Sequence, residues 1–175
     1  MDQLQRNCME ITTSLFKEVP NDRLPLLLIP FPSHRFSSQE ILDSQFTQLQ
    51  MLQDDSNPNF VFEVLSIFFK DSERILNSIA FSLAQSQVDF SKVNAHAHQL
   101  KGSSSSIGAS RVKNACIALR SYCEEHNVEG CIGWLHRLKE EYYLVKTKLE
   151  ALFKVEQQII AGGGVVPAFL ERRDY

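Results

Sequence analysis

The chain has 175 residues, which is the length of a single domain, and hydrophobic residues make up 43% and charged residues 22% of it. These fractions are ordinary for a globular protein and exclude intrinsic disorder of the whole chain. The 18 Lys and Arg residues against 21 Asp and Glu residues give a net charge of −3, which argues against a protein that coats nucleic acid or binds membranes through a polybasic segment.

Apolar residues recur at steps of three and four along most of the chain, a spacing that predicts amphipathic helices. Glycine (7) and proline (6) are few for a β-rich fold with many turns, and no run of residues alternates as a strand would. We therefore expect an all-α antiparallel bundle of about six helices, with helical patterns over residues 4–15, 42–52, 58–79, 90–107, 110–123 and 135–152.

Residues suited to helix ends stand between these patterns. Asn57 and Pro58 predict a start, with asparagine as the cap and proline at the first helical position. Asp89 and Ser110 are the predicted caps of the next two helices. Gly108 is expected to end the helix before Ser110, because glycine readily adopts the left-handed conformation just past a helix.

One segment does not fit a bundle. Val19–Gln39 holds four of the six prolines, has no helical period and separates two helical patterns that would otherwise join directly. A structureless stretch of this length is unusual inside a compact domain. It is either a disordered loop or a translated intron or unusual splice form, since valine codons begin with GT and Gln39 can be encoded by CAG. Sequencing the transcript distinguishes the two.

The chain therefore divides into four parts. Residues 1–18 form an N-terminal helix, residues 19–39 an atypical, unstructured insert, residues 40–160 a helical bundle and residues 161–175 a flexible tail. The first residues carry charges, so they have no apolar signal core, and the longest apolar stretch is far short of the ~20 residues that cross a bilayer. We expect a cytoplasmic and nuclear protein.

The four cysteines, Cys8, Cys116, Cys123 and Cys131, form no Cys-x-x-Cys pair. The last three are spaced by 7 and 8 residues, within helical patterns. This spacing suits buried thiols better than a zinc site or a disulfide framework.

The chemistry is concentrated in the helix around His98. At about 100° per residue, the residues that share its face are polar or small, whereas those on the other side form the expected core face. The face of His98 comprises Ser91, Asn94, Lys101, Gly102, Ser105 and Ala109; the core face comprises Val93, Ala97, Leu100, Ser104 and Ile107.

A neutral imidazole is a good nucleophile near neutral pH. Lys101, three residues on, can reach an anion carried by His98, and Gly102 leaves room for another protein to approach. This arrangement suits reversible phosphoryl transfer. The chain has no Walker-type glycine loop and no evident magnesium-binding carboxylates, so a partner must supply the rest.

The histidines also admit other interpretations. A solvent-facing histidine alone is more often inert than functional, and His96 is interpreted as structural or supporting because it lies near the core-facing Leu100. A His-x-His metal pair is disfavoured, because side chains two residues apart diverge on a helix. No Glu-x-x-His pair exists for a di-iron site, and we expect neither a metal nor a cofactor.

The segment HQLKGSSSSIGASRVKNAC, from His98 to Cys116, closely resembles the plant histidine-containing phosphotransfer (HPt) proteins. The segments LDSQFTQLQMLQDDSNPNFV and EEYYLVKTKLE are also similar to that family. The resemblance covers most of residues 42–164 and part of residues 1–18, and the insert at residues 19–39 departs from it.

The resemblance implies a C-terminal four-helix, up-and-down core and a phosphoryl-accepting His98, with the family's motif lysine and glycine at Lys101 and Gly102. Gln99 and Ser105 are expected on the docking surface. The implied partners are hybrid histidine kinases and response regulators in cytokinin-type two-component signalling. Their receiver domains would supply the catalytic aspartate and Mg²⁺. The resemblance implies a carrier and not an enzyme, and we expect a monomer, because a monomer leaves the face of His98 free.

Two alternatives stay open at this point. The chain could be a non-relaying helical module or decoy that binds receiver domains, impaired by the insert, and a phosphotransfer assay with and without residues 19–39 would separate these functions. An enzyme acting on a small molecule has little support, because no carboxylate pair or nucleophile–base pair is evident.

Overall fold

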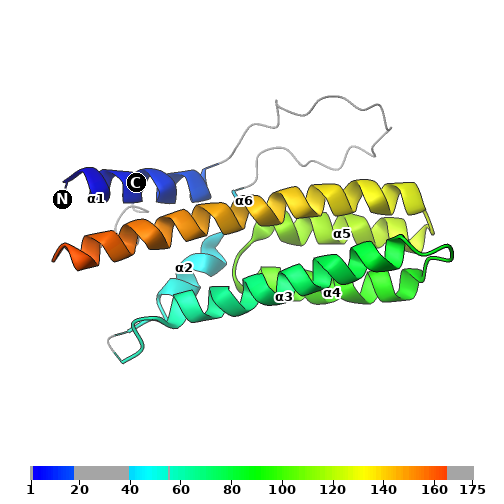
Figure 1. Ribbon diagram of the computed structural model, residues 1–175, viewed down its shortest axis with the longest axis horizontal. Coiled ribbons are helices and arrows are strands. Elements are labelled where there is room, and N and C mark those ends of the chain that lie inside the picture. The colour runs from blue at the N-terminus through cyan, green and yellow to red at the C-terminus, as the bar shows by residue number, and fades with distance from the viewer. Residues whose placement is uncertain (1, 18–39, 55, 165–175) are drawn as a thin grey trace.

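A computed structural model of the protein describes residues 2–17, 40–54 and 56–164 and contains six helices in this part of the chain (Figure 1). They are α1 (Asp2–Phe16), α2 (Ser44–Gln50), α3 (Phe60–Leu83), α4 (Phe90–Ser106), α5 (Ser110–Glu124) and α6 (Val128–Ala161). The described residues form no strand, and the expected all-α bundle is confirmed. The insert at residues 19–39 and the end of the tail lie outside the described residues.

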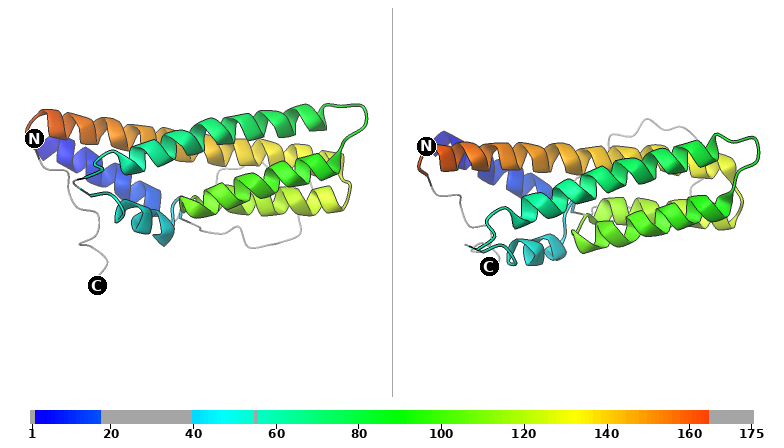
Figure 2. Two further views of the ribbon diagram at one scale, coloured as in Figure 1. Left: turned by 90° about the horizontal axis from the view of Figure 1, so that it is seen from below. Right: turned by 60° about the horizontal axis from the view of Figure 1, so that its bottom comes forward.

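Four antiparallel helices form the bundle that positions the site. Helix α3 packs on α4, α4 on α5, α5 on α6, and α6 closes the ring by packing on α3. Helix α6 is the longest, at 34 residues, and its C-terminal half extends beyond α5, where α1 lies along it (Figures 1 and 2). The short α2 lies beyond one end of α4 (Figure 2).

The core lies along the axis of this bundle. Each helix contributes the apolar residues that recur at helical spacing, and Leu65, Leu100, Leu119 and Leu138 are among those with no or almost no exposed surface. Burying one such side chain contributes about 1.5–3 kcal/mol to folding, so the amphipathic faces alone determine which side of each helix turns inward.

The predicted cap of α4 is confirmed. The side chain of Asp89 accepts a hydrogen bond from the backbone N–H of Lys92 at 3.1 Å, and Gly108 follows the end of the helix with a φ of +78°. Asn127 caps α6 in the same way, accepting from the N–H of Gly130 at 2.8 Å. Such caps satisfy N–H groups that have no partner inside the helix.

Two predicted helix starts are wrong. Helix α3 begins at Phe60 and not at Pro58, because the Asp54 carboxylate accepts from the N–H groups of Ser56 and Asn57 and holds that segment in a turn. Ser110 does not cap α5 but is its first residue, and its hydroxyl donates to the backbone carbonyl of Glu40. In the second case a tertiary hydrogen bond replaces the local one.

The two residues just before α2 are hydrogen-bonded to the turn between α4 and α5 and to the end of α1. The N–H of Asp43 donates to the carbonyl of Gly108 at 2.9 Å. The N–H of Leu42 donates to the carbonyl of Leu15 at 3.0 Å. The backbone before residue 17 and the backbone after residue 40 are therefore in direct contact, whatever lies between them in the sequence.

Candidate functional site

His98 lies near the middle of α4 and is exposed, as predicted. The opposite face of the helix anchors it, since Val93, Ala97 and Leu100 are fully buried against the bundle. A rigid, well-packed helix therefore presents the imidazole to solvent, which is the arrangement that allows a second protein to reach it.

The surface next to His98 is low and open. A Cβ atom added to Gly102 would meet nothing within 4 Å apart from the backbone of its own helix, so this position is clear, as predicted. The hydroxyls of Ser105 and Ser106 donate to the carbonyls of Lys101 and Gly102, at 2.9 and 3.2 Å. Because these side chains fold back onto the helix, they add little height to the surface.

Two of the predicted site residues differ in exposure. Gln99 is exposed directly after His98, whereas Lys101 is half-buried. The positive charge of Lys101 acts on the Cys116 thiol, so Lys101 lies within electrostatic reach of α5. Burial raises the pKa of the Cys116 thiol of α5 to about 12, and the positive charges of Arg120 and Lys101 oppose that rise.

The structure adds a cation that the sequence interpretation missed. Arg120 of α5 donates from Nε to the side-chain oxygen of Asn94 at 2.7 Å, and Asn94 lies one turn before His98 on the same face. Arg120 is therefore held at Asn94, one turn before His98, and Lys101 follows His98 by three residues on the same helix. Helical spacing predicts Asn94 on this face, but only tertiary packing brings in Arg120, 26 positions further along.

His96 is half-buried, and its Nδ1 has no hydrogen-bond partner among the described residues. This position agrees with the supporting role expected for it. All four cysteines are buried and unpaired, as predicted from their spacing. In residues 2–17, 40–54 and 56–164 no group of three or more His, Cys, Asp or Glu residues could hold a metal ion.

Residues 63–152 match the Hpt domain family. Over 128 residues, 73% of this chain, the sequence is 65% identical to histidine-containing phosphotransfer protein 1 of Arabidopsis thaliana, of which that alignment covers 83%. The chain belongs to the Hpt family. It is also 44% identical to Arabidopsis histidine-containing phosphotransfer protein 2 over 166 residues, which are 94% of this chain and 93% of the relative.

A solved Hpt structure has the same architecture. The histidine-containing phosphotransfer protein from Medicago truncatula is 42% identical, covers 94% of this chain over 98% of its own length, and superposes with a TM-score of 0.76. The bundle described above is thus the Hpt fold, including its four-helix core.

These comparisons support histidine phosphotransfer in plant two-component signalling as the function of the chain. As an Hpt protein it is a phosphorelay carrier, which interacts with histidine kinases and response regulators. The alternative of a non-relaying module is not favoured, because the relative that is 65% identical is named a phosphotransfer protein, whereas two relatives named pseudo histidine-containing phosphotransfer proteins are 45% identical. No helix in the described part of the chain is long and apolar enough to span a membrane.

Proposed function

We propose that His98 is the phosphoryl-accepting residue of this Hpt protein and that Lys101, Gly102 and Arg120 serve it. The observation that carries the proposal is the exposed imidazole in the middle of α4, beside an open position at Gly102. Gln99 and Ser105 belong to the surface on which the partner domain docks.

The reaction we propose is an in-line transfer from a receiver domain. The lone pair of His98 Nε2 attacks the phosphorus of an aspartyl phosphate, the bond from phosphorus to the aspartate oxygen breaks, and the carboxylate leaves with the electron pair. The imidazole keeps its proton on Nδ1. Transfer from phospho-His98 to the next receiver is the reverse of this step on a different aspartate.

In this reaction the chain positions the attacking imidazole and supplies positive charge beside it. The core face of α4 fixes the ring, and the cations at Lys101 and Arg120 offset the phosphoryl charge on the Hpt side. The Mg²⁺ and the acidic pocket belong to the receiver, so the carrier itself needs no cofactor and is not an enzyme in isolation. We further propose hybrid kinases and response regulators of the cytokinin type as partners, with the carrier moving between cytoplasm and nucleus.

The test is phosphoryl transfer from a labelled, phosphorylated receiver domain to the full-length chain. We expect acid-labile, base-stable phosphate on His98 and no labelling of the His98→Gln variant. The matched control is His136→Gln, which removes another exposed histidine and keeps full labelling. Circular dichroism checks that both variants are folded, and normal labelling of folded His98→Gln contradicts the assignment.

The two cations are tested separately. Lys101→Ala and Arg120→Ala should each slow the transfer by about tenfold, which corresponds to a transition state that is less stable by ~1.4 kcal/mol. Lys139→Ala, on α6, is the control for the loss of a positive charge. Unchanged rates for both site variants would remove the role given to the cations, while the assignment of His98 would stand.

A further inference from the structure

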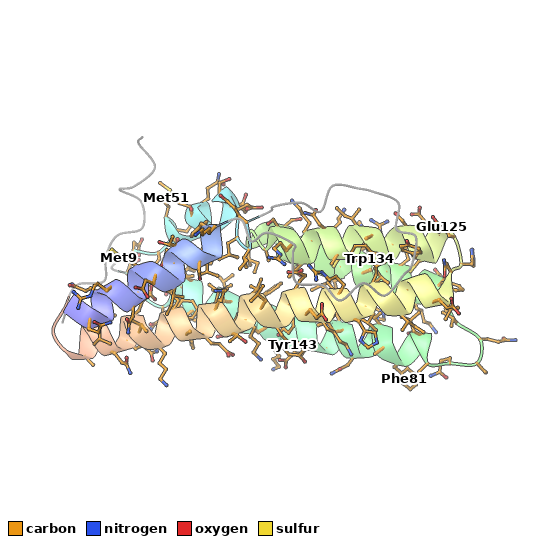
Figure 3. All side chains as sticks on the ribbon, turned by 90° about the horizontal axis from the view of Figure 1, so that it is seen from above. Met9, Met51, Phe81, Glu125, Trp134 and Tyr143 are labelled. Atoms are coloured by element: carbon orange, nitrogen blue, oxygen red, sulfur yellow. The ribbon has the colours of Figure 1, made fainter. Side chains whose placement is uncertain are left out.

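Two cysteines that phosphotransfer does not use lie in contact at one end of the bundle. The Sγ atoms of Cys123 and Cys131 are 3.6 Å apart and share a hydrogen bond. Cys123 lies in the last turn of α5 and Cys131 in the first turns of α6, on either side of the short connection that joins the two helices. Figure 3 shows Glu125, a residue of that connection, at the end of the bundle.

We propose that Cys123 and Cys131 form a redox-active dithiol, which a peroxide-class oxidant converts to a disulfide that links α5 to α6. The inference goes beyond the relay proposed above and does not depend on it. The sulfur atoms are already neighbours, so forming a bond of about 2.05 Å requires only a small movement of two side chains.

The bonds and electrons balance in two steps. The thiolate of one cysteine attacks an oxygen of hydrogen peroxide, so that an S–O bond forms, the O–O bond breaks and water leaves after taking up a proton. The second sulfur then attacks the sulfenic acid, the S–S bond forms, the S–O bond breaks and a second water leaves. Two thiols are oxidised and one peroxide is reduced to two waters.

The hydrogen bond between the sulfurs favours this pair over the other two cysteines. It lowers the pKa of the Cys123 thiol, because the Cys131 thiol can donate to the Cys123 thiolate. By contrast, burial raises the pKa of the Cys8 thiol to about 11 and that of Cys116 to about 12, and neither has a second cysteine in contact.

Access to the pair is through the end of the bundle. Cys123 is 3% and Cys131 0% exposed, so an oxidant reaches them when the connection opens locally. Helix ends open at lower free energy than helix centres, and this connection is short and exposed, with His126 at a positive φ of 54°. Cys116 lies two turns deeper in α5 and lacks this route.

The test is peroxide treatment of the full-length, reduced protein, followed by blocking of the remaining thiols and digestion. Trypsin cleaves after Arg120 and Arg137, so both cysteines fall in one peptide, residues 121–137. We expect this peptide to become two hydrogen atoms lighter and to take up no blocking reagent. Cleavage after Glu124 and Glu129 should then leave two fragments joined until a thiol reductant separates them.

The controls are Cys123→Ser, Cys131→Ser and Cys116→Ser. The first two should form no intramolecular disulfide, and Cys116→Ser should behave as the wild type. The proposal is overturned if the wild-type peptide 121–137 stays reduced while Cys8 or Cys116 is oxidised. It is also overturned if the only disulfides join separate chains. The wild-type result stands by itself should a serine variant fail to fold.

Discussion

Gly108 and Gly102 lie only six residues apart, but glycine has opposite effects on stability at the two positions. Gly108 has a φ of +78°, and a Cβ atom there would lie 2.5 Å from the backbone nitrogen of Phe46 and 2.8 Å from a carboxylate oxygen of Asp43. Gly102 lies inside a helix with open space beside it. One glycine is needed by the fold, whereas the other is a cost to the helix.

We therefore predict opposite effects of alanine at the two positions. Gly108→Ala should lower the free energy of unfolding by more than ~1–2 kcal/mol, since the left-handed backbone alone costs that much and the contact with Phe46 adds to it. Gly102→Ala should raise it, by up to about 1 kcal/mol, because alanine favours the helix. Urea unfolding measures both, and a stable Gly108→Ala variant would contradict the packing of residues 43–46 on this turn.

At the scale of elements, α1 is joined to the bundle chiefly through α6. Cys8 and Leu15 of α1 are fully buried, and Lys148 of α6 donates to the hydroxyl of Ser14 at 2.7 Å. Glu156 of α6 lies in this contact near Cys8, and burial raises its pKa from 4.5 to about 7. A carboxyl group in this position makes the attachment of α1 depend on pH.

The direction of this pH dependence of stability follows from proton binding. Between pH 4.5 and about 7 the folded protein keeps a proton on Glu156 that the unfolded chain has lost, so the free energy of unfolding falls as the pH rises through this range and levels off above it. We predict that Glu156→Gln leaves stability near pH 4 unchanged and raises it at pH 8, by at most about 3 kcal/mol. Thermal unfolding at the two pH values measures this.

The control for that series is Glu150→Gln, a more exposed carboxylate on the same helix. Glu150→Gln should not give a gain in stability that appears only at pH 8. If Glu156→Gln and the wild type keep a constant difference across the range, Glu156 does not titrate with a raised pKa.

The contact between Leu15 and Leu42 indicates what a deletion of residues 19–39 would do to stability. Because the N–H of Leu42 already donates to the carbonyl of Leu15, a chain that joins Glu18 directly to Glu40 has five residues to connect points that are adjacent. Shortening a loop lowers the entropy cost of closing it, by about 1–1.5 kcal/mol for this change in length. We predict that deleting residues 19–39 keeps the fold and raises the free energy of unfolding by about that amount.

The measurements are urea unfolding and the phosphotransfer assay on the same deletion variant. The deleted protein should accept phosphate on His98 at least as fast as the full chain. Loss of helical structure on deletion would mean that the segment supports the bundle, and the contact between residues 15 and 42 would not be sufficient to hold α1.

At the scale of the whole molecule, the exposed face of α4 bears on the oligomeric state. A homodimer formed through α4 would cover His98 and the open surface at Gly102. We therefore predict a monomer with the mass of one chain, 20.0 kDa, and a one-to-one complex with a receiver domain. Light scattering after gel filtration measures both masses, and a stable dimer whose formation blocks labelling of His98 would contradict this prediction.

The sequence by itself determined the all-α class and the face of α4 that carries His98, but not where every helix begins. Buried and exposed positions on α4 follow from the spacing of apolar residues, because burial of that face outweighs local preferences. The open surface at Gly102 was also predictable, because a glycine on an outward face has no side chain to fill the space. The motif around His98 was specific enough to indicate the family.

Only the tertiary structure decided which residues from other helices meet these positions. It brought Arg120 to Asn94, Ser110 to the carbonyl of Glu40, and Cys123 to Cys131. Periodicity says which way a side chain points but not which helix lies opposite, or at what height. Those contacts depend on the lengths of the connections and on how the helices pack, and a single sequence does not encode either in a local pattern.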